Sequence, residues 1–180
     1  MSPATEIEIL FLQYKAKIER VAFKDDDYYK PYLSKDEEKI RFDFEWKLQM
    51  SGFEYVGGGI SRKTFVHKRS RRCFKLNYNG LPENEQEMKT FLEISKRDRV
   101  HFAACYGFLN GDTDMMEVEF IDWPLAKEES KFSRDIKNKA NETIRKMKNR
   151  YKFDDMHGGN YAINPKTGEV KILDYAMSKL

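Results

Sequence analysis

The sequence predicts an α+β fold: two N-terminal helices, a strand-rich middle with one inserted helix, a long helix and a closing hairpin. Apolar side chains recur at steps of three and four residues over the first fifty residues and again over residues 132–147, which is the period of a helix. From residue 53 to residue 121 short apolar runs separated by turns are typical of strands. The length of 180 residues fits one globular domain, and 13 Phe, 10 Tyr and 2 Trp are too many for a disordered chain.

Each of the two N-terminal helices is expected to begin with a capping box. Thr5 with Glu8, and Ser34 with Glu37, have the spacing at which a hydroxyl and a carboxylate cap the first turn reciprocally. The second helix should end at Gly52. The apolar face of the first helix comprises Ile7, Leu10, Phe11, Tyr14, Ile18 and Val21. That of the second helix comprises Ile40, Phe44 and Leu48.

The strand-rich middle is expected to hold five strands. They are residues 53–56, 63–67, 73–77, 102–109 and 115–121. The sequence Asn110-Gly111-Asp112 between the last two is a strong hairpin turn. A helix over residues 83–95 should point Met88, Phe91 and Leu92 inward. The closing hairpin joins residues 161–163 to residues 170–173.

The apolar pattern and the two cysteines indicate a protein of a reducing compartment. No apolar run approaches the roughly 18 residues of a membrane-spanning helix, and the first eight residues lack the pattern of a signal peptide. Cys73 and Cys105 both stand in apolar, strand-like runs, so buried free thiols are expected. We therefore expect a cytoplasmic protein with no membrane partner.

Charge does not require a nucleic-acid partner. The net charge is only +3, although residues 131–150 carry eight basic and two acidic side chains, a local charge of +6. No aromatic residues are interleaved there for base stacking, so a solvated helix face is favoured and nucleic acid is not expected as a partner. The acidic run Asp25-Asp26-Asp27 is favoured as a solvated turn, because consecutive carboxylates cannot all face one ion.

The chemistry is concentrated near the C-terminus. Asp155 is followed five residues later by Asn160, and Asp174 stands just past the closing hairpin. Phosphoryl transfer uses one carboxylate to orient the acceptor hydroxyl, and an amide oxygen with a second carboxylate to hold Mg²⁺. Because the hairpin brings its two ends together, Asn160 and Asp174 are expected to meet around one ion.

With these residues in this order, the sequence resembles the protein-kinase-like superfamily from about residue 53 onward. Gly57, Gly58 and Gly59 look like the glycine-rich loop over the nucleotide phosphates. Lys75 looks like the strand lysine that grips the phosphates. Glu85 is its expected ion-pair partner, and Glu87 is the alternative, because helix phase alone does not separate them.

The resemblance assigns roles to further residues. Glu119 and Ile121 lie in a segment similar to the hinge, whose backbone groups bind adenine. Asp155 matches the catalytic Asp, Asn160 the metal-binding Asn, and Asp174 the metal-binding Asp of the Asp-Phe-Gly motif. The implied cofactors are ATP and Mg²⁺.

Several positions depart from the family pattern. Phe153 and Asp154 replace the His and Arg that precede the catalytic Asp, and Arg62 replaces the third glycine of the glycine loop. His157 gives a D-x-H-x-x-N loop similar to that of small-molecule and atypical kinases, or it is a loop-packing residue. Only residues 177–180 follow the sequence Asp-Tyr-Ala, so no activation segment is expected.

The resemblance implies a minimal two-lobe kinase. Residues 1–52 form a helical extension, residues 53–121 a small antiparallel-sheet N-lobe with one helix, and residues 122–180 a reduced helical C-lobe. The N-terminal helices are expected to fill the underside of that C-lobe. The implied activity is ATP- and Mg²⁺-dependent phosphorylation of a protein Ser/Thr hydroxyl. The alternative is a pseudokinase that binds nucleotide as a binding or inhibitory module.

Overall fold

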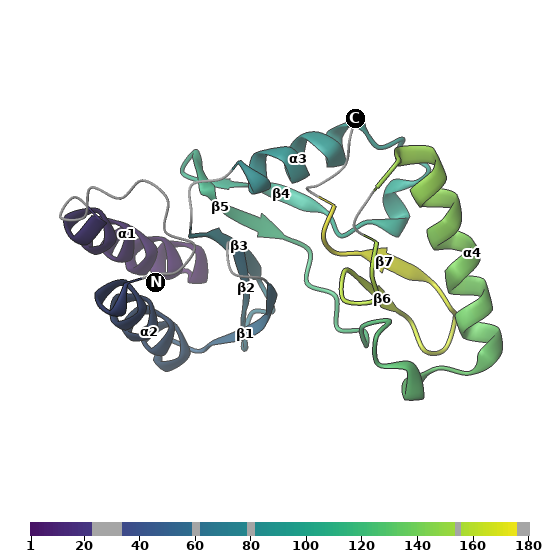
Figure 1. Ribbon diagram of the computed structural model, residues 1–180, viewed down its shortest axis with the longest axis horizontal. Helices are drawn as coiled ribbons and strands as arrows, with labels where there is room; N and C mark the ends of the chain where they lie inside the picture. The colour runs from purple at the N-terminus through teal and green to yellow at the C-terminus, as the bar shows by residue number, and fades with distance from the viewer. Residues whose placement is uncertain (23–33, 59–61, 79–81, 154–155, 176–180) are drawn as a thin grey trace.

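The α+β fold is confirmed in a computed structural model that describes residues 1–22, 34–58, 62–78, 82–153 and 156–175. Its α-helices are α1 (Pro3–Ala22), α2 (Lys35–Met50), α3 (Glu83–Glu93) and α4 (Arg134–Tyr151). Its larger sheet contains β1 (Phe53–Gly58), β2 (Arg62–His67), β3 (Cys73–Asn77), β4 (Cys105–Leu109) and β5 (Asp112–Val118). A hairpin of β6 (Tyr161–Ile163) and β7 (Val170–Ile172) follows α4 (Figure 1).

The five strands form one antiparallel sheet in the order β1-β2-β3-β5-β4. The expected hairpin between β4 and β5 is present. Asn110 and Gly111 adopt left-handed φ values of 47° and 78°, which is the backbone that a tight hairpin turn requires. This arrangement, with α3 packed beside the sheet, is compatible with the small lobe of a protein kinase.

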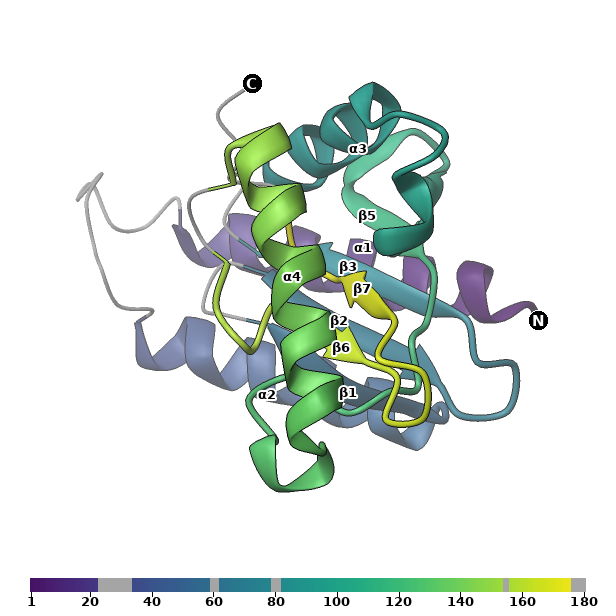
Figure 2. The same cartoon turned by 90° about the vertical axis from the view of Figure 1, so that its right-hand side faces the viewer.

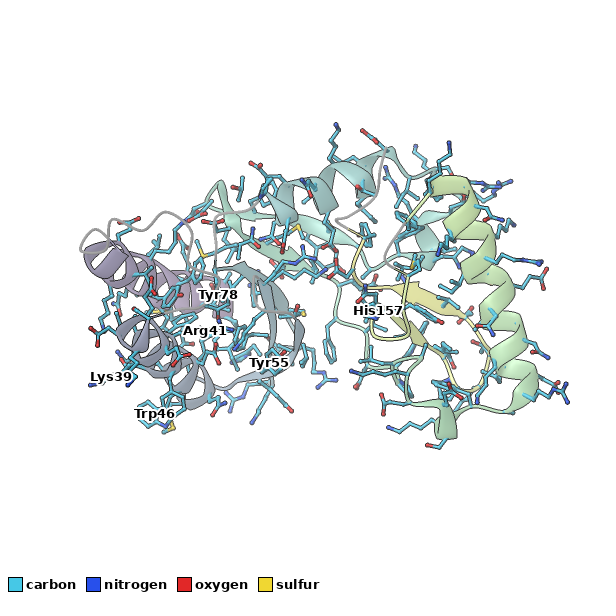
Figure 3. All side chains as sticks on the ribbon, in the orientation of Figure 1. Lys39, Arg41, Trp46, Tyr55, Tyr78 and His157 are labelled. Atoms are coloured by element: carbon cyan, nitrogen blue, oxygen red, sulfur yellow. The ribbon has the colours of Figure 1, made fainter. Side chains whose placement is uncertain are left out.

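Helices α1 and α2 cover one face of this sheet (Figures 1 and 2). The apolar core between them comprises Ile7, Phe11, Tyr14, Phe44, Leu48, Phe53, Phe65, Phe74, Leu76 and Met115. Arg41 of α2 adds a cation–π contact, 4.9 Å above the ring of Tyr78 (Figure 3). The expectation that these helices fill the underside of the C-terminal part is therefore wrong. The apolar outer face of the sheet needs a cover, and the two helices supply it.

The two expected helix starts have different outcomes. Ser34 forms the predicted capping box with Glu37 at the start of α2. The box at Thr5 is wrong, because α1 begins earlier, at Pro3, where proline suits the first turn. The Ser2 hydroxyl instead accepts a hydrogen bond from the Thr5 N–H at 3.2 Å. The acidic run at residues 25–27 lies outside the described residues.

Helix α3 lies near the other face, but its phase differs from the expected one. Leu92 is 63% exposed, whereas Asn84, Glu87 and Thr90 are buried. These three residues recur at steps of three, so the helix turns a polar stripe inward. Met88 and Phe91 are only partly buried and pack against a second apolar core, which includes Phe102, Ile144, Met147 and Ile172.

Backbone hydrogen bonds and helix α4 hold the C-terminal hairpin in place. The Ala103 N–H donates to the Ile172 carbonyl at 2.8 Å, and the Ile163 N–H donates to the Pro124 carbonyl at 3.0 Å. Helix α4 lies over the hairpin and contacts β7 (Figure 2). Its inward residues are Ala140, Ile144 and Met147, as the helical period predicts. None of the described helices is long and apolar enough to cross a membrane.

Both cysteines are buried and free, as expected. Burial raises the pKa of Cys73 and of Cys105 to about 12, so both remain uncharged thiols. They behave as small apolar side chains of the core.

Candidate functional site

The site is built around Lys75 in the middle strand of the sheet. All five residues of β3 are buried, and their side chains alternate between the two faces. Phe74 and Leu76 join the core under α1 and α2, while Lys75 and Asn77 point the other way. Lys75 is only 6% exposed. A buried ammonium group is tolerated only where partners replace its water shell.

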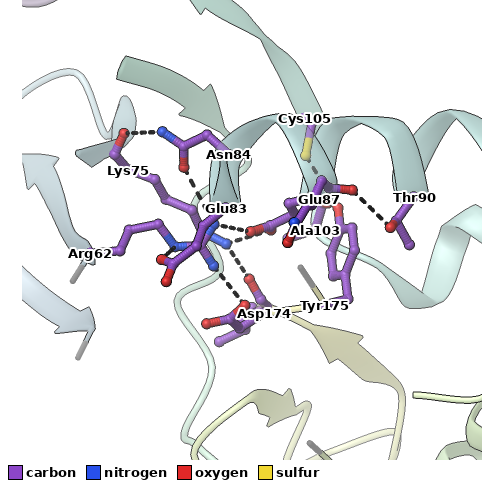
Figure 4. Close-up of polar contacts among 12 residues, drawn as sticks. Arg62, Lys75, Glu83, Asn84, Glu87, Thr90, Ala103, Cys105, Asp174 and Tyr175 are labelled. Atoms are coloured by element: carbon purple, nitrogen blue, oxygen red, sulfur yellow. Dashed lines mark hydrogen bonds and ion pairs between the residues drawn. The ribbon is translucent and has the colours of Figure 1, made fainter. Parts of the chain in front are cut away.

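Two partners hold the Lys75 ammonium. Its Nζ donates to Oε1 of Glu87, which is 1% exposed, and to the carbonyl oxygen of Leu173 at 2.5 Å. Leu173 directly precedes Asp174. The lysine therefore connects the sheet, helix α3 and the end of the closing hairpin (Figure 4).

The structure decides between the two glutamates that the sequence left open. Glu87 is the partner of Lys75, and the expectation for Glu85 is wrong because Glu85 points to solvent. The phase of α3 is the reason: its inward stripe contains Asn84 and Glu87, three residues apart.

Arg62 of β2 is a second buried cation beside Lys75. It is 5% exposed. Its Nη1 lies 2.7 Å from Oε2 of Glu87, in the geometry of a charge contact rather than a directed hydrogen bond. Its Nη2 donates to Oδ1 of Asp174 at 2.6 Å. Burial lowers the pKa of Arg62, but the charges of Glu87 and Asp174 outweigh it and raise that pKa, so the guanidinium stays charged.

In the sequence, Arg62 stands out only as the residue that replaces the third glycine of the glycine loop. The signal that could have identified it is strand register. Arg62 pairs with Asn77 and Thr64 pairs with Lys75, so alternation places Arg62 and Lys75 on the same face. Asn84 belongs to the same cluster, because its Oδ1 accepts from Arg62 Nη1 at 3.3 Å.

The glycine segment runs along β1 beside Arg62. Gly58 has φ +134°, and a Cβ there would lie 2.3 Å from the Arg62 carbonyl oxygen, so only glycine fits. A Cβ at Gly57 would meet no atom within 4 Å, which leaves open space above that residue. Gly59 lies outside the described residues.

The closing hairpin brings Asn160 next to Asp174, as its geometry predicts. The Asn160 carbonyl accepts from the Leu173 N–H at 2.8 Å and from the Asp174 N–H at 3.4 Å. In the preceding loop, His157 Nδ1 accepts from the Gly159 N–H at 3.0 Å, a contact that packs the loop. Asp154 and Asp155 lie outside the described residues.

The segment after β5 is tied to the hairpin by Glu119. The Glu119 carboxylate accepts from Lys171 Nζ at 3.0 Å and from the Ala104 N–H at 3.0 Å. The Glu119 N–H donates to the Ala104 carbonyl at 2.8 Å. Ile121 is partly buried beyond the end of the strand. The predicted adenine contacts of Glu119 and Ile121 stay a prediction.

The Lys75–Glu87 pair is thus buried between the antiparallel sheet and α3, with the hairpin residues Asn160 and Asp174 alongside. No family model matches this chain, and no curated protein matches its sequence. The fold of the chain is similar to that of a solved structure, the crystal structure of Rad53 1-466 in complex with AMP-PNP. The TM-score is 0.50 with 15% sequence identity over 77% of this chain. The match spans 42% of the Rad53 chain, and at this identity it shows similarity of fold alone.

Proposed function

We propose that this protein binds ATP with Mg²⁺ and transfers the γ-phosphoryl group to a hydroxyl, with a protein Ser/Thr as acceptor. The observation that carries the proposal is the buried Lys75–Glu87 pair, whose lysine also reaches the carbonyl beside Asp174. In this proposal residues 1–52 are a helical extension, residues 53–121 the N-lobe and residues 122–180 a reduced C-lobe.

The sheet side of the site would hold the nucleotide. Lys75 would contribute the positive charge for the α- and β-phosphates, and Glu87 would hold its ammonium in position. The backbone of the segment Gly57–Gly59 would approach the phosphates, for which the open space at Gly57 leaves room. Backbone groups at Glu119 and Ile121 would contact adenine.

The hairpin side would hold the metal. Asn160 and Asp174 offer an amide oxygen and a carboxylate, the hard oxygen donors that Mg²⁺ prefers. Among the described residues no group of three or more His, Cys, Asp or Glu forms a metal cluster. Mg²⁺ bound with phosphates needs only one or two protein ligands, so the pair fits. Bound there, the ion would neutralise charge on the β- and γ-phosphates, while Asp155 would orient the acceptor hydroxyl.

One observation favours a second candidate function. Arg62 already binds Asp174 at 2.6 Å, and the same carboxylate is the proposed metal ligand. A nucleotide-binding pseudokinase, acting as a binding or inhibitory module, would tolerate this contact permanently. In an active kinase, the contact between Arg62 and Asp174 would have to open so that Asp174 can bind the metal.

The test combines binding with transfer. The melting temperature is measured with ATP in Mg²⁺ and in EDTA, and γ-labelled ATP is incubated with the protein, with and without a cell lysate. Ligand at a hundredfold excess over Kd should add about 2.7 kcal/mol of stability. At one fixed ATP concentration, the gain in stability should be larger in Mg²⁺ than in EDTA. No shift at millimolar Mg·ATP overturns both candidates. A shift without any transferred label selects the pseudokinase.

Variants of neighbouring aspartates locate the transfer step. Asp155→Asn should leave the Mg·ATP shift intact and lower transfer by about 10²–10⁴-fold, the usual contribution of positioned proton transfer. Asp154→Asn is the matched control, because that residue has no assigned chemical role, and it should change turnover far less. Equal losses for both variants would contradict the assignment of Asp155.

A further inference from the structure

We propose that Arg62 is a built-in counter-cation of the metal site: its guanidinium neutralises Asp174 in the free protein, and a divalent cation must displace that contact to bind. The inference rests on the proposed function, because it takes Asp174 as a metal ligand. It adds a residue to which the kinase resemblance assigns no role.

The contacts of Arg62 span the site from one side to the other. Its Nη1 lies 2.7 Å from Glu87 and its Nη2 lies 2.6 Å from Asp174 (Figure 4). Its Nε lies 3.6 Å from Oε2 of Glu83, and Asn84 accepts from Nη1. One rigid, planar group is therefore held by acidic and amide oxygens from α3 and by the carboxylate that ends the hairpin.

The two cations divide the carboxylates between them. Lys75 faces Oε1 of Glu87 and Arg62 faces Oε2, so Glu87 is neutralised on both oxygens. The second contact of Arg62, to Asp174, then balances the charge of that carboxylate. A divalent cation at Asp174 would lie next to a permanent positive charge in a partly buried site, where like charges repel strongly.

The exposed fractions of the two side chains show which of them a cation from solvent can reach. The Asp174 side chain is 45% exposed, whereas the Arg62 side chain is 7% exposed. A cation from solvent can reach Asp174, but Arg62 cannot turn to solvent without breaking its contacts with α3. The free protein should consequently bind divalent cations weakly. Phosphate oxygens, which guanidinium groups bind well, would offer Arg62 a replacement for Asp174 when metal and nucleotide arrive together.

The experiment measures Mn²⁺ binding to the full chain without nucleotide, by the electron paramagnetic resonance signal of the free ion. Arg62→Gln should bind Mn²⁺ about 10- to 100-fold more tightly than the wild type, the range over which groups beside metal ligands change affinity. Arg62→Lys keeps the charge and should stay near the wild-type affinity. Arg72→Gln is the matched control, because Arg72 pairs with Glu117 away from Asp174, and it should change nothing.

Adding Asp174→Asn to the Arg62→Gln variant should remove the gain. Equal Mn²⁺ affinity in wild type and Arg62→Gln, or a gain that survives Asp174→Asn, overturns the inference. A purely structural Arg62 would lower the melting temperature without moving the Mn²⁺ affinity. If Arg62→Gln does not fold, side-chain nitrogen NMR of the wild type gives the answer: high Mg²⁺ should shift the Arg62 signal and leave that of Arg72, and an unshifted Arg62 signal overturns the inference.

The two proposals fail in different ways. A missing Mg·ATP thermal shift would overturn the proposed function and leave the Mn²⁺ comparison between wild type and Arg62→Gln standing. Equal Mn²⁺ affinities would overturn the role of Arg62 and leave nucleotide binding standing.

Discussion

The two faces of the middle strand β3 are both buried but differ in chemistry. Toward α1 and α2, β3 presents Phe74 and Leu76 to an aromatic-rich core. Toward α3 it presents Lys75 and Asn77, and β2 adds Arg62. One strand of five residues thus serves a structural face and a polar one through simple alternation.

The difference indicates which face is kept for stability and which for chemistry. Burial of apolar area is the dominant stabilising contribution to folding. A buried ion pair contributes little net stability, because the cost of removing charges from water offsets their attraction. A cluster of two cations and several carboxylates is therefore poorly explained by stability. In the proposed function, this cluster holds charges ready for a charged ligand.

The largest expected effect breaks the apolar face. Phe74→Ala should cost about 3–5 kcal/mol of unfolding free energy, because Phe74 is fully buried and leaves a cavity. Its neighbour Lys75→Met should cost less, about 1–3 kcal/mol, since Glu87 keeps Arg62 as a partner. Urea unfolding of both variants measures the difference. A larger loss for Lys75→Met would mean that the charged face carries the stability.

A double-mutant cycle tests the ion pairing on the charged face. In a double-mutant cycle, Lys75→Met and Glu87→Gln should show a coupling energy of about 0.5–3 kcal/mol, because the residues are in direct contact. Replacing the exposed Glu85 by Gln should change stability by no more than about 0.5 kcal/mol. Additive losses for Lys75 and Glu87, or coupling with Glu85 instead, would contradict the pairing.

The smallest effect concerns a charge outside the sheet. Burial raises the pKa of Asp98, but hydrogen bonds from Arg150 and Tyr151 outweigh it and lower that pKa from 3.8 to about 2. Since the folded pKa is depressed, the carboxylate stabilises the protein above pH 3.8 and loses this contribution as the pH falls toward 2. Asp98→Asn should therefore be less stable than the wild type at pH 7 and equally stable below pH 2. A stability difference that is the same at both pH values would contradict this.

Local signals in the sequence predicted the elements well. The strand at residues 73–77 and the cap at Ser34 are as expected, because alternation and capping depend on a few neighbouring residues. The proximity of the Asn160 and Asp174 backbones was also predictable, since a short hairpin brings its ends together. A metal ion shared by their side chains stays a prediction.

Tertiary packing set what the sequence could not predict. The inward phase of α3, and with it the choice of Glu87, depends on where the sheet places its two cations. The packing of α1 on the sheet depends on which apolar face of the sheet no other element covers. Arg62 was missed because its role arises from strand register and from a contact 112 residues away along the chain.

If the proposed function is right, the charged face of the sheet is a nucleotide site. Lys63 and Lys75 test it directly, because they lie on adjacent strands and opposite faces; Lys63 binds Glu45 of α2 at 2.5 Å. Titration calorimetry with Mg·ATP should give a Kd about tenfold or more weaker for Lys75→Met than for the wild type, the usual loss of a hydrogen bond to a charged group. Lys63→Met should bind like the wild type. Equal affinity for both variants, or no binding by the wild type, would contradict the claim.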